Sequence, residues 1–323
     1  MVPFTAIMTA MLVSAASAGG PVLAVANKHD DTLSFIDVTS LELLETIPTG
    51  PNPHEIAITP DQRVMYLSNY APPGDTISVI DPVQRRHIKQ ISTGEYTRIH
   101  GAAMAPDGAH AYFTAGQTGF VVEVDTSTNE VTRAMPTHGK ISHMVLVSPD
   151  NERLYTANIV SETVSVIDRA SGELITQIPC GKGVEGMAFT PDGKHLWAAN
   201  QTGGSVTIID VATHEPLETF ACPGMPVRIA FSADGARAYI PSWTEEGVLI
   251  VIDTETKSEI TRIPVGSYAI GVALSPDGRR AFVGCEHGDG LHVINLDTLS
   301  VEKVIHTGNG PDAMMVWFPP KDT

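Results

Sequence analysis

A Pro-Asp pair recurs along the chain at nearly constant spacing, and its prolines are Pro60, Pro106, Pro149, Pro191 and Pro276. Ala233 takes the same place in "SADG", so successive copies lie 42 to 46 residues apart. A degraded further copy, "GNGPDAMMVWFPP", stands near the end of the sequence. Repeats of this length are typical of folds built from one supersecondary unit, because a single unit cannot bury its own apolar face. The spacing therefore restricts the chain to a repeat architecture.

Each repeat reads as four short strands. An apolar strand such as Ile56 to Thr59 is followed by a Pro-Asp-Gly type turn, in which proline presets φ and glycine accepts a positive φ. Segments of the types "VMYLSN", "TISVID" and "ELLETIPTG" follow in that order. Alternation with a period of two and many β-branched residues indicate strands rather than helices. Four strands in a repeat of roughly 40–45 residues are the signature of a propeller blade.

The two ends of the sequence complete one blade between them. The first repeat begins at a second strand, "PVLAVAN", and the last ends with a lone first strand, "DAMMVWF". Joining one C-terminal strand to three N-terminal strands removes the open sheet edges that a ring would otherwise leave. The sequence thus predicts an all-β, seven-bladed β-propeller with four antiparallel strands per blade, forming one domain over residues 19–323.

Two stretches resemble a known family of repeats. "HLWAANQTGGSVTIIDVATHEPLETF" and "RLYTANIVSETVSVIDRASGELITQIPCGKG" are similar to the YVTN-type repeats of bacterial and archaeal β-propellers, and the similarity extends over nearly all of residues 19–323. It implies the propeller fold. It implies no single function, because the relatives include surface proteins, haem d1-type propellers and lactonase-like proteins, and fold alone does not carry chemistry.

The N-terminal residues have the features of an export signal. A short apolar run over residues 6–16 precedes Ala16-Ser17-Ala18, which fits a small-x-small cleavage site. We predict a signal peptide over residues 1–18 and a periplasmic or secreted mature chain; the alternative is the start of a cytosolic protein. The run is too short to span a membrane. A net charge of −17 argues against nucleic acid or an anionic membrane surface as a partner.

One repeat position gathers polar residues. Alignment of the repeats on Pro-Asp gives, at the start of each first strand, His54, His100, His143, Glu185, Val227 and Ile270. In the last repeat the position is taken by Asp312 or Ala313, and the likeness of "GNGPD" to "GPNPH" favours Asp312. Since first strands line the central channel of a propeller, we expect these side chains to converge at one level.

Imidazole and carboxylate groups in this arrangement indicate a metal site. The expected cofactor is a divalent transition metal (Cu, Fe, Zn or Mn) held by His54, His100 and His143, with Glu185 and Asp312 beside them. Three histidines leave a coordination position open for water or substrate. Glu185 is open to three roles: a fourth ligand, a hydrogen-bond partner of a histidine, or a general base. The alternative is a polar lining of a water-filled channel.

Residues in the loops that lead to the same mouth form a second group. Tyr96, Arg98, Arg228 and Tyr268 are expected to assist catalysis, with the two guanidinium groups holding a carboxylate or an anionic intermediate. The alternative is that each arginine pairs with a nearby glutamate. Cys180 and Cys222 occupy equivalent repeat positions, which leaves both a disulfide and two free thiols open.

These residues define two hypotheses for function. The first is a metal-dependent oxidoreductase or lyase acting on a small organic substrate, with a lactonase-like hydrolase as a weaker variant. The second is a non-catalytic propeller that serves as a binding, metal-carrier or accessory module for a periplasmic protein partner, since propellers offer broad loop faces.

Overall fold

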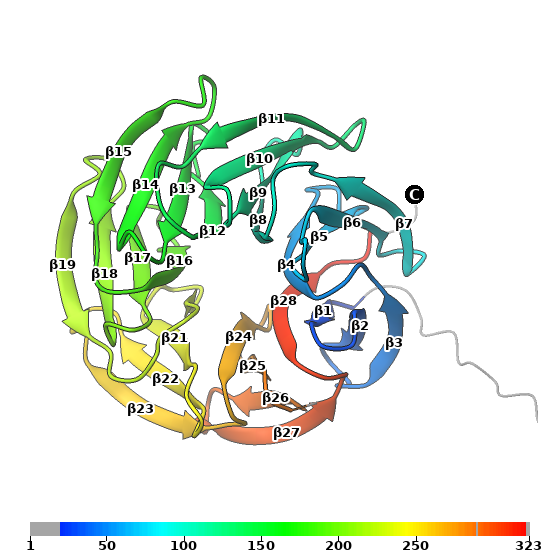
Figure 1. The fold of residues 1–323 in the computed structure, drawn as a ribbon. Coiled ribbons are helices and arrows are strands. Elements are labelled where there is room, and N and C mark those ends of the chain that lie inside the picture. The colour runs from blue at the N-terminus through cyan, green and yellow to red at the C-terminus, as the bar shows by residue number, and fades with distance from the viewer. Residues whose placement is uncertain (1–19, 289, 321–323) are drawn as a thin grey trace, which may run out of the picture.

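The computed structural model describes residues 20–288 and 290–320, and the predicted signal peptide over residues 1–18 lies outside this part. The secondary structure of the described residues consists of 28 strands in seven four-stranded sheets. Figure 1 shows the sheets arranged as blades around a central axis. The predicted seven-bladed β-propeller is confirmed. Among the described residues, no helix is long and apolar enough to cross a membrane.

The sheets are described in order around the ring, each from its innermost strand outward. The sheet formed by both ends of the chain contains β28 (Pro311–Trp317), β1 (Val22–Asn27), β2 (Thr32–Asp37) and β3 (Leu43–Pro48). The next contains β4 (Pro53–Ile58), β5 (Met65–Asn69), β6 (Thr76–Asp81) and β7 (Arg86–Ser92). The third contains β8 (Ile99–Met104), β9 (His110–Ala115), β10 (Phe120–Asp125) and β11 (Glu130–Pro136). The fourth contains β12 (Ser142–Val147), β13 (Arg153–Asn158), β14 (Thr163–Asp168) and β15 (Leu174–Pro179).

Three further sheets complete the ring. The fifth contains β16 (Val184–Phe189), β17 (His195–Asn200), β18 (Ser205–Asp210) and β19 (Pro216–Ala221). The sixth contains β20 (Ala230–Phe231), β21 (Arg237–Ser242), β22 (Val248–Asp253) and β23 (Glu259–Pro264). The seventh contains β24 (Ala269–Leu274), β25 (Arg280–Cys285), β26 (Gly290–Asn295) and β27 (Ser300–His306).

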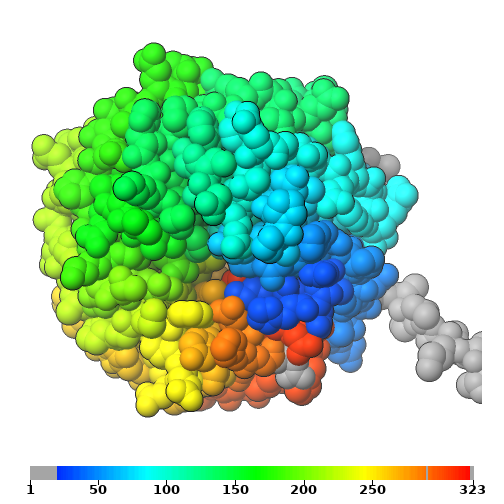
Figure 2. All heavy atoms as spheres, viewed as in Figure 1, coloured from blue at the N-terminus to red at the C-terminus, as the bar shows by residue number. Residues whose placement is uncertain are grey.

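The C-terminal strand closes the ring as the sequence predicts. β28 pairs antiparallel with β1 and is the innermost strand of its sheet. In Figure 1 the red β28 lies beside the blue β1, and in Figure 2 the first blue residues lie against the last red ones. No sheet edge is therefore left open between the first and last blades.

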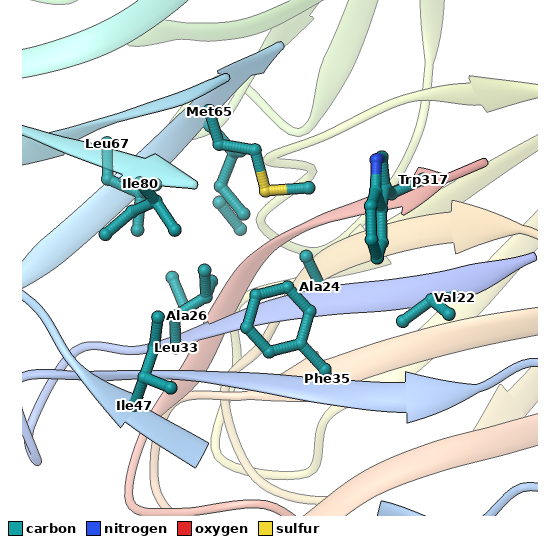
Figure 3. Packing of buried hydrophobic residues seen from close by; sticks show 12 residues of the cluster. Val22, Ala24, Ala26, Leu33, Phe35, Ile47, Met65, Leu67, Ile80 and Trp317 are labelled. Atoms are coloured by element: carbon teal, nitrogen blue, oxygen red, sulfur yellow. The ribbon is translucent and has the colours of Figure 1, made fainter. Parts of the chain in front are cut away.

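Apolar side chains fill the spaces between neighbouring blades. The cluster in Figure 3 joins the first and second sheets through Phe35, Met65, Leu67, Ile80 and Trp317, all of them buried. The second and third strands of each blade lie between two such layers, so they are buried on both faces even where their sequences alternate between apolar and polar residues. The fourth strands are largely exposed because they form the rim.

In several blades the second strand ends in an asparagine whose side chain is hydrogen-bonded to the third strand. Asn27 donates from Nδ2 to the hydroxyls of Ser34 at 2.9 Å and Thr32 at 3.0 Å, and Asn200 does the same with Ser205 and Thr207.

The three cysteines are free thiols. Cys180 and Cys222, for which the sequence left a disulfide open, are therefore not bonded to each other, and Cys285 is also free.

The innermost strands carry an irregularity that determines how they face the channel. The pairing of β4 with β5 shifts register between Pro53 and Ile56, which leaves His54 and Glu55 outside the regular ladder. The freed N–H of Glu55 donates to the Ser68 hydroxyl at 2.9 Å. Because a bulge breaks the strict alternation of a strand, two consecutive residues can reach the channel.

Candidate functional site

The strand register settles which residues form the predicted ring. In each sheet the innermost strand pairs with the strand beside it. Pro311 pairs with Asn27, the last residue of β1, just as Pro53 pairs with Asn69, the last residue of β5. The residue that follows Pro311 is Asp312, so Asp312 rather than Ala313 occupies the ring position. We call this set the channel ring; its members are His54, His100, His143, Glu185, Val227, Ile270 and Asp312.

The rings of His54, His100 and His143 pack against one another in a row, edge to face between His54 and His100, and we call this row the histidine stack. The centroids of the His54 and His100 rings lie 4.7 Å apart, and those of His100 and His143 lie 3.6 Å apart. The Tyr70 ring lies 4.7 Å from that of His54 and 5.3 Å from that of His100. His100 is only 3% exposed. Among the described residues, the Nδ1 atoms of His100 and His143 have no hydrogen-bond partner.

Burial keeps the histidine stack uncharged. It lowers the pKa of His54 to about 4, with the charges of Lys28 and Arg228 acting in the same direction. Burial likewise holds the pKa values of His100 and His143 well below their usual range. Neutral imidazole keeps a nitrogen lone pair, so the stack can bind a metal centre near neutral pH.

A buried ion-pair network adjoins the histidine stack. Arg228 donates to the carboxylates of Glu55 and Glu185, and its Nη1 lies 3.4 Å from Oε1 of Glu185. Burial raises the pKa of each glutamate to about 7, while the charge of Arg228 opposes that rise. The sequence reasoning missed Glu55. Glu55 and Arg228 both follow a ring residue directly, so the same repeat alignment could have indicated the pair.

A second cation neutralises the remaining ring carboxylate. The Nζ of Lys28 lies 2.8 Å from Oε1 of Glu286 and 3.3 Å from Oδ2 of Asp312, and Asp312 is fully buried. Burial acts to raise the pKa of Asp312, but the charges of Lys28, His54 and Arg228 outweigh it, so this pKa is lowered. Lys28 and Glu286, which stand just after the second strands β1 and β25, were also missed by the sequence reasoning.

Arg98 lies at the mouth beside the histidine stack. Its Cζ stands 4.7 Å from the centroid of the Tyr70 ring, and among the described residues it forms no ion pair with a carboxylate. Its φ of 60° is rare for a residue with a side chain and marks a locally strained turn. A cavity of about 180 Å³ lies between Arg98, His100 and His143. This cavity joins a free guanidinium to neutral imidazoles.

The two tyrosines predicted to assist catalysis lie apart from the histidines. The Tyr96 ring packs on Phe120 at 5.2 Å, within the apolar layer between two blades. The Tyr268 ring packs between Trp243 at 5.1 Å and His287 at 4.1 Å. In the part of the chain that the structure describes, neither tyrosine has a ring contact or side-chain hydrogen bond with the channel ring. Their catalytic role stays a prediction.

One family model matches part of the chain. The model of the Cytochrome D1 heme domain matches residues 150–267, less than half of the sequence. This segment contains Glu185 and Arg228 but none of the three stacked histidines. No curated protein matches the chain.

Several solved structures share the fold. Hydrazine synthase of Kuenenia stuttgartiensis is 23% identical, with a TM-score of 0.72 over 88% of this chain and 92% of that chain. A functionally unknown protein from Desulfotomaculum acetoxidans is 18% identical, with a TM-score of 0.78 over 92% and 99%. Dihydro-heme d1 dehydrogenase NirN, solved in complex with DHE, is 18% identical, with a TM-score of 0.68 over 91% and 74%. Identities this low establish the propeller fold alone.

The expected cofactor, a divalent transition-metal ion, is wrong. The matching family model describes a haem domain, in which a tetrapyrrole and not a bare ion is bound. Within residues 20–288 and 290–320, no group of three or more His, Cys, Asp or Glu side chains is arranged to hold a metal ion. The histidine rings pack against one another, and Arg228 and Lys28 already engage the ring carboxylates.

Proposed function

We propose that the protein binds a haem-type tetrapyrrole at the channel mouth beside the histidine stack. The observation that carries this proposal is the stack of His54, His100 and His143, which is buried, uncharged and supplied with unpartnered ring nitrogens. The partial match to a haem-domain model supports it. So does the shared fold with NirN, whose structure holds a haem-like molecule.

The residues at the mouth fit such a ligand in three respects. Neutral imidazole is a common axial ligand of haem iron, and His143 is the least buried of the three histidines. The apolar side chains of Ile141 and Val160 are 40% and 59% exposed at the same rim, which suits the face of a large ring. Arg98 has no acidic partner among the described residues and matches a carboxylate substituent.

The cavity alone is too small to enclose the ligand. Its volume of about 180 Å³ is below the ~300–1,000 Å³ of sites that surround a drug-sized molecule. The open mouth, with its apolar rim, would therefore receive the macrocycle. Haem iron, once bound, would supply electron transfer or the binding of a small molecule.

The remaining residues would hold the channel side of the site. His143 would hold the iron, the His100 ring packs against that of His143, and Tyr70 packs against His100. Arg228 bridges Glu55 and Glu185 and so prevents two buried carboxylates from repelling one another. Asp312 lies 4.0 Å from Nε2 of His54 and is itself held by Lys28. The network keeps the imidazoles in place without giving them a proton.

We place the mature protein outside the cytoplasm, in the periplasm or secreted. The apolar run over residues 6–16 and the Ala16-Ser17-Ala18 site support this assignment. Cleavage after Ala18 is tested by N-terminal sequencing of the protein recovered from the periplasm of a bacterial host. Recovery of an uncleaved chain in the cytosol alone would contradict it.

The proposal is tested by titrating the purified protein with iron protoporphyrin and recording the visible absorption spectrum. We expect a saturable shift of the main haem band in the wild type and its loss in a double variant, His100→Ala with His143→Ala. His87→Ala, on the outer strand β7, is the matched control and should behave as the wild type. Titration with metal-free protoporphyrin, followed by its fluorescence, measures how much of the binding comes from the apolar rim without coordination of iron by a histidine. No saturable shift in the wild type, or the same shift in the double variant, would overturn the proposal.

A further inference from the structure

Every blade has the same backbone hydrogen bond at the channel mouth. The residue that follows each second strand donates its N–H to the carbonyl of the residue two positions before the channel ring. The accepting residues, which we call the collar, are Asn52, Arg98, Ile141, Gly183, Met225, Tyr268 and Gly310. All of them except Met225 have a positive φ, between 54° and 70°. The repeat therefore imposes a left-handed backbone on the collar, whichever type of residue stands there.

Ile141 is the collar residue for which this backbone conformation is most costly. Glycine and asparagine adopt it readily, and Asn52, Gly183 and Gly310 supply these types in three blades. A β-branched side chain is the least suited to it. Among all described residues with a positive φ, Ile141 alone is β-branched. The blade β12–β15 thus carries the least suitable residue type at a position where other blades carry suitable ones.

Packing within the protein does not compensate for the strain at Ile141. Leu41 and Leu299 also have a positive φ, but Leu41 is only 5% exposed and Leu299 packs against a buried apolar cluster. Ile141 is 40% exposed and takes no part in the apolar layers on either side of its blade. A strained residue that contributes little to the core points to a function for its side chain.

The position of Ile141 shows what that function could be. Its side chain lines the cavity of about 180 Å³ that also contains Arg98, His100 and His143. Val160, which is 59% exposed, lies on the adjoining loop of the same blade, where its N–H donates to the carbonyl of Lys140 at 3.2 Å. Two exposed β-branched side chains therefore stand beside the histidine stack at the channel mouth.

We propose that Ile141 and Val160 form an apolar clamp on the face of the bound ring, and that the chain keeps Ile141 in a strained backbone for this contact. The inference rests on the proposed function and adds an orientation to it. The apolar part of the macrocycle would lie over the loops of β12–β15, and a carboxylate substituent would point toward Arg98, in the loop before β8. Burial of the clamp would contribute to affinity whether or not the ring carries iron.

The test is the variant Ile141→Asn, which supplies a residue that accepts the left-handed backbone and removes the apolar side chain. We expect its thermal midpoint to rise by about 2–4 °C. Its affinity for metal-free protoporphyrin, followed by fluorescence, should fall about tenfold. Val160→Thr keeps the side-chain shape, so it should weaken binding without raising the midpoint. A merely structural role for Ile141 would not combine higher stability with weaker binding.

Lys257→Asn is the matched control. Lys257 has a φ of 59° in the turn between β22 and β23, at the far end of the blade from the mouth, so this variant should gain stability and keep the wild-type affinity. An unchanged affinity in Ile141→Asn, or a midpoint that does not rise, would overturn the clamp and leave the proposed function standing. So would a wild type that binds iron protoporphyrin but not the metal-free ring. Failure of the wild type to bind either porphyrin would overturn both proposals.

Discussion

Replacing Glu185 by glutamine should make the protein less sensitive to rising pH. Burial raises the pKa of Glu185 to about 7 from its ordinary value of 4.5. A carboxyl group whose pKa is raised on folding contributes stability that is complete below pH 4.5 and is lost as the pH rises through 7. A difference of about 2.5 pKa units at 1.36 kcal/mol per unit gives a loss of roughly 3 kcal/mol.

The assay is urea denaturation of wild type and Glu185→Gln at pH 4.5 and at pH 8. For each protein we take the change in the free energy of unfolding between the two pH values and compare these changes. The comparison cancels the effect of the substitution on packing and the contributions of all titrating groups common to both proteins. We expect Glu185→Gln to gain roughly 3 kcal/mol relative to the wild type between the two pH values. Glu55 shares Arg228 with Glu185, so the two titrate as a pair and the gain should be spread over a wide pH range.

The reasoning would be refuted by a difference between the two proteins that does not change with pH. A relative loss at pH 8 would refute it more strongly, because it would mean that the ion pair with Arg228 outweighs burial and depresses the pKa of Glu185. Glu173→Gln, in the exposed turn before β15, is the control and should show no such dependence.

Two further predictions concern the channel. Folding lowers the pKa of His54 from 6.5 to about 4, so the neutral side chain contributes about 3 kcal/mol of stability above pH 6.5, and this contribution is lost as the pH falls to 4. In His54→Gln, the urea midpoint should therefore fall less between pH 6.5 and pH 4 than it does in the wild type. An equal fall in both proteins would contradict burial as the cause. Gly186→Ala would place a Cβ 1.9 Å from the carbonyl oxygen of Val227, so we expect a loss of about 1–3 kcal/mol or more and a lower thermal midpoint, whereas an unchanged midpoint would show that the inner strands can separate.

Much of the fold follows from the repeat alone. Each copy carries its own strand and turn signals, and closure between β28 and β1 follows from which strands are missing at the two ends. The channel ring was predictable for a related reason, since one repeat position maps to one level of the channel. His54, His100 and His143 therefore meet as expected.

The ion pairs of the site were harder to predict from the sequence than the histidine stack. Glu55 follows His54 directly, and strict alternation would direct it away from the channel; only the bulge in β4 brings it to Arg228. Lys28 reaches Asp312 from a loop on the first blade, a contact that no spacing in the sequence marks. Tyr96 lies in the apolar layer between two blades, a position that the repeat alignment does not indicate. The cofactor class was misjudged because residue types alone do not reveal how rings stack.

The contact between Lys28 and Asp312 ties the site to the order in which the chain is made. The two residues belong to the first and last parts of the described chain, and their ion pair forms only when β28 has paired with β1. Residue 312 must therefore have left the ribosome before the channel network can assemble, and contacts of such long sequence separation generally form slowly. During synthesis the six central blades would be present while Asp312 is still missing. Until then Lys28 would have Glu286 as its only acidic partner among the described residues.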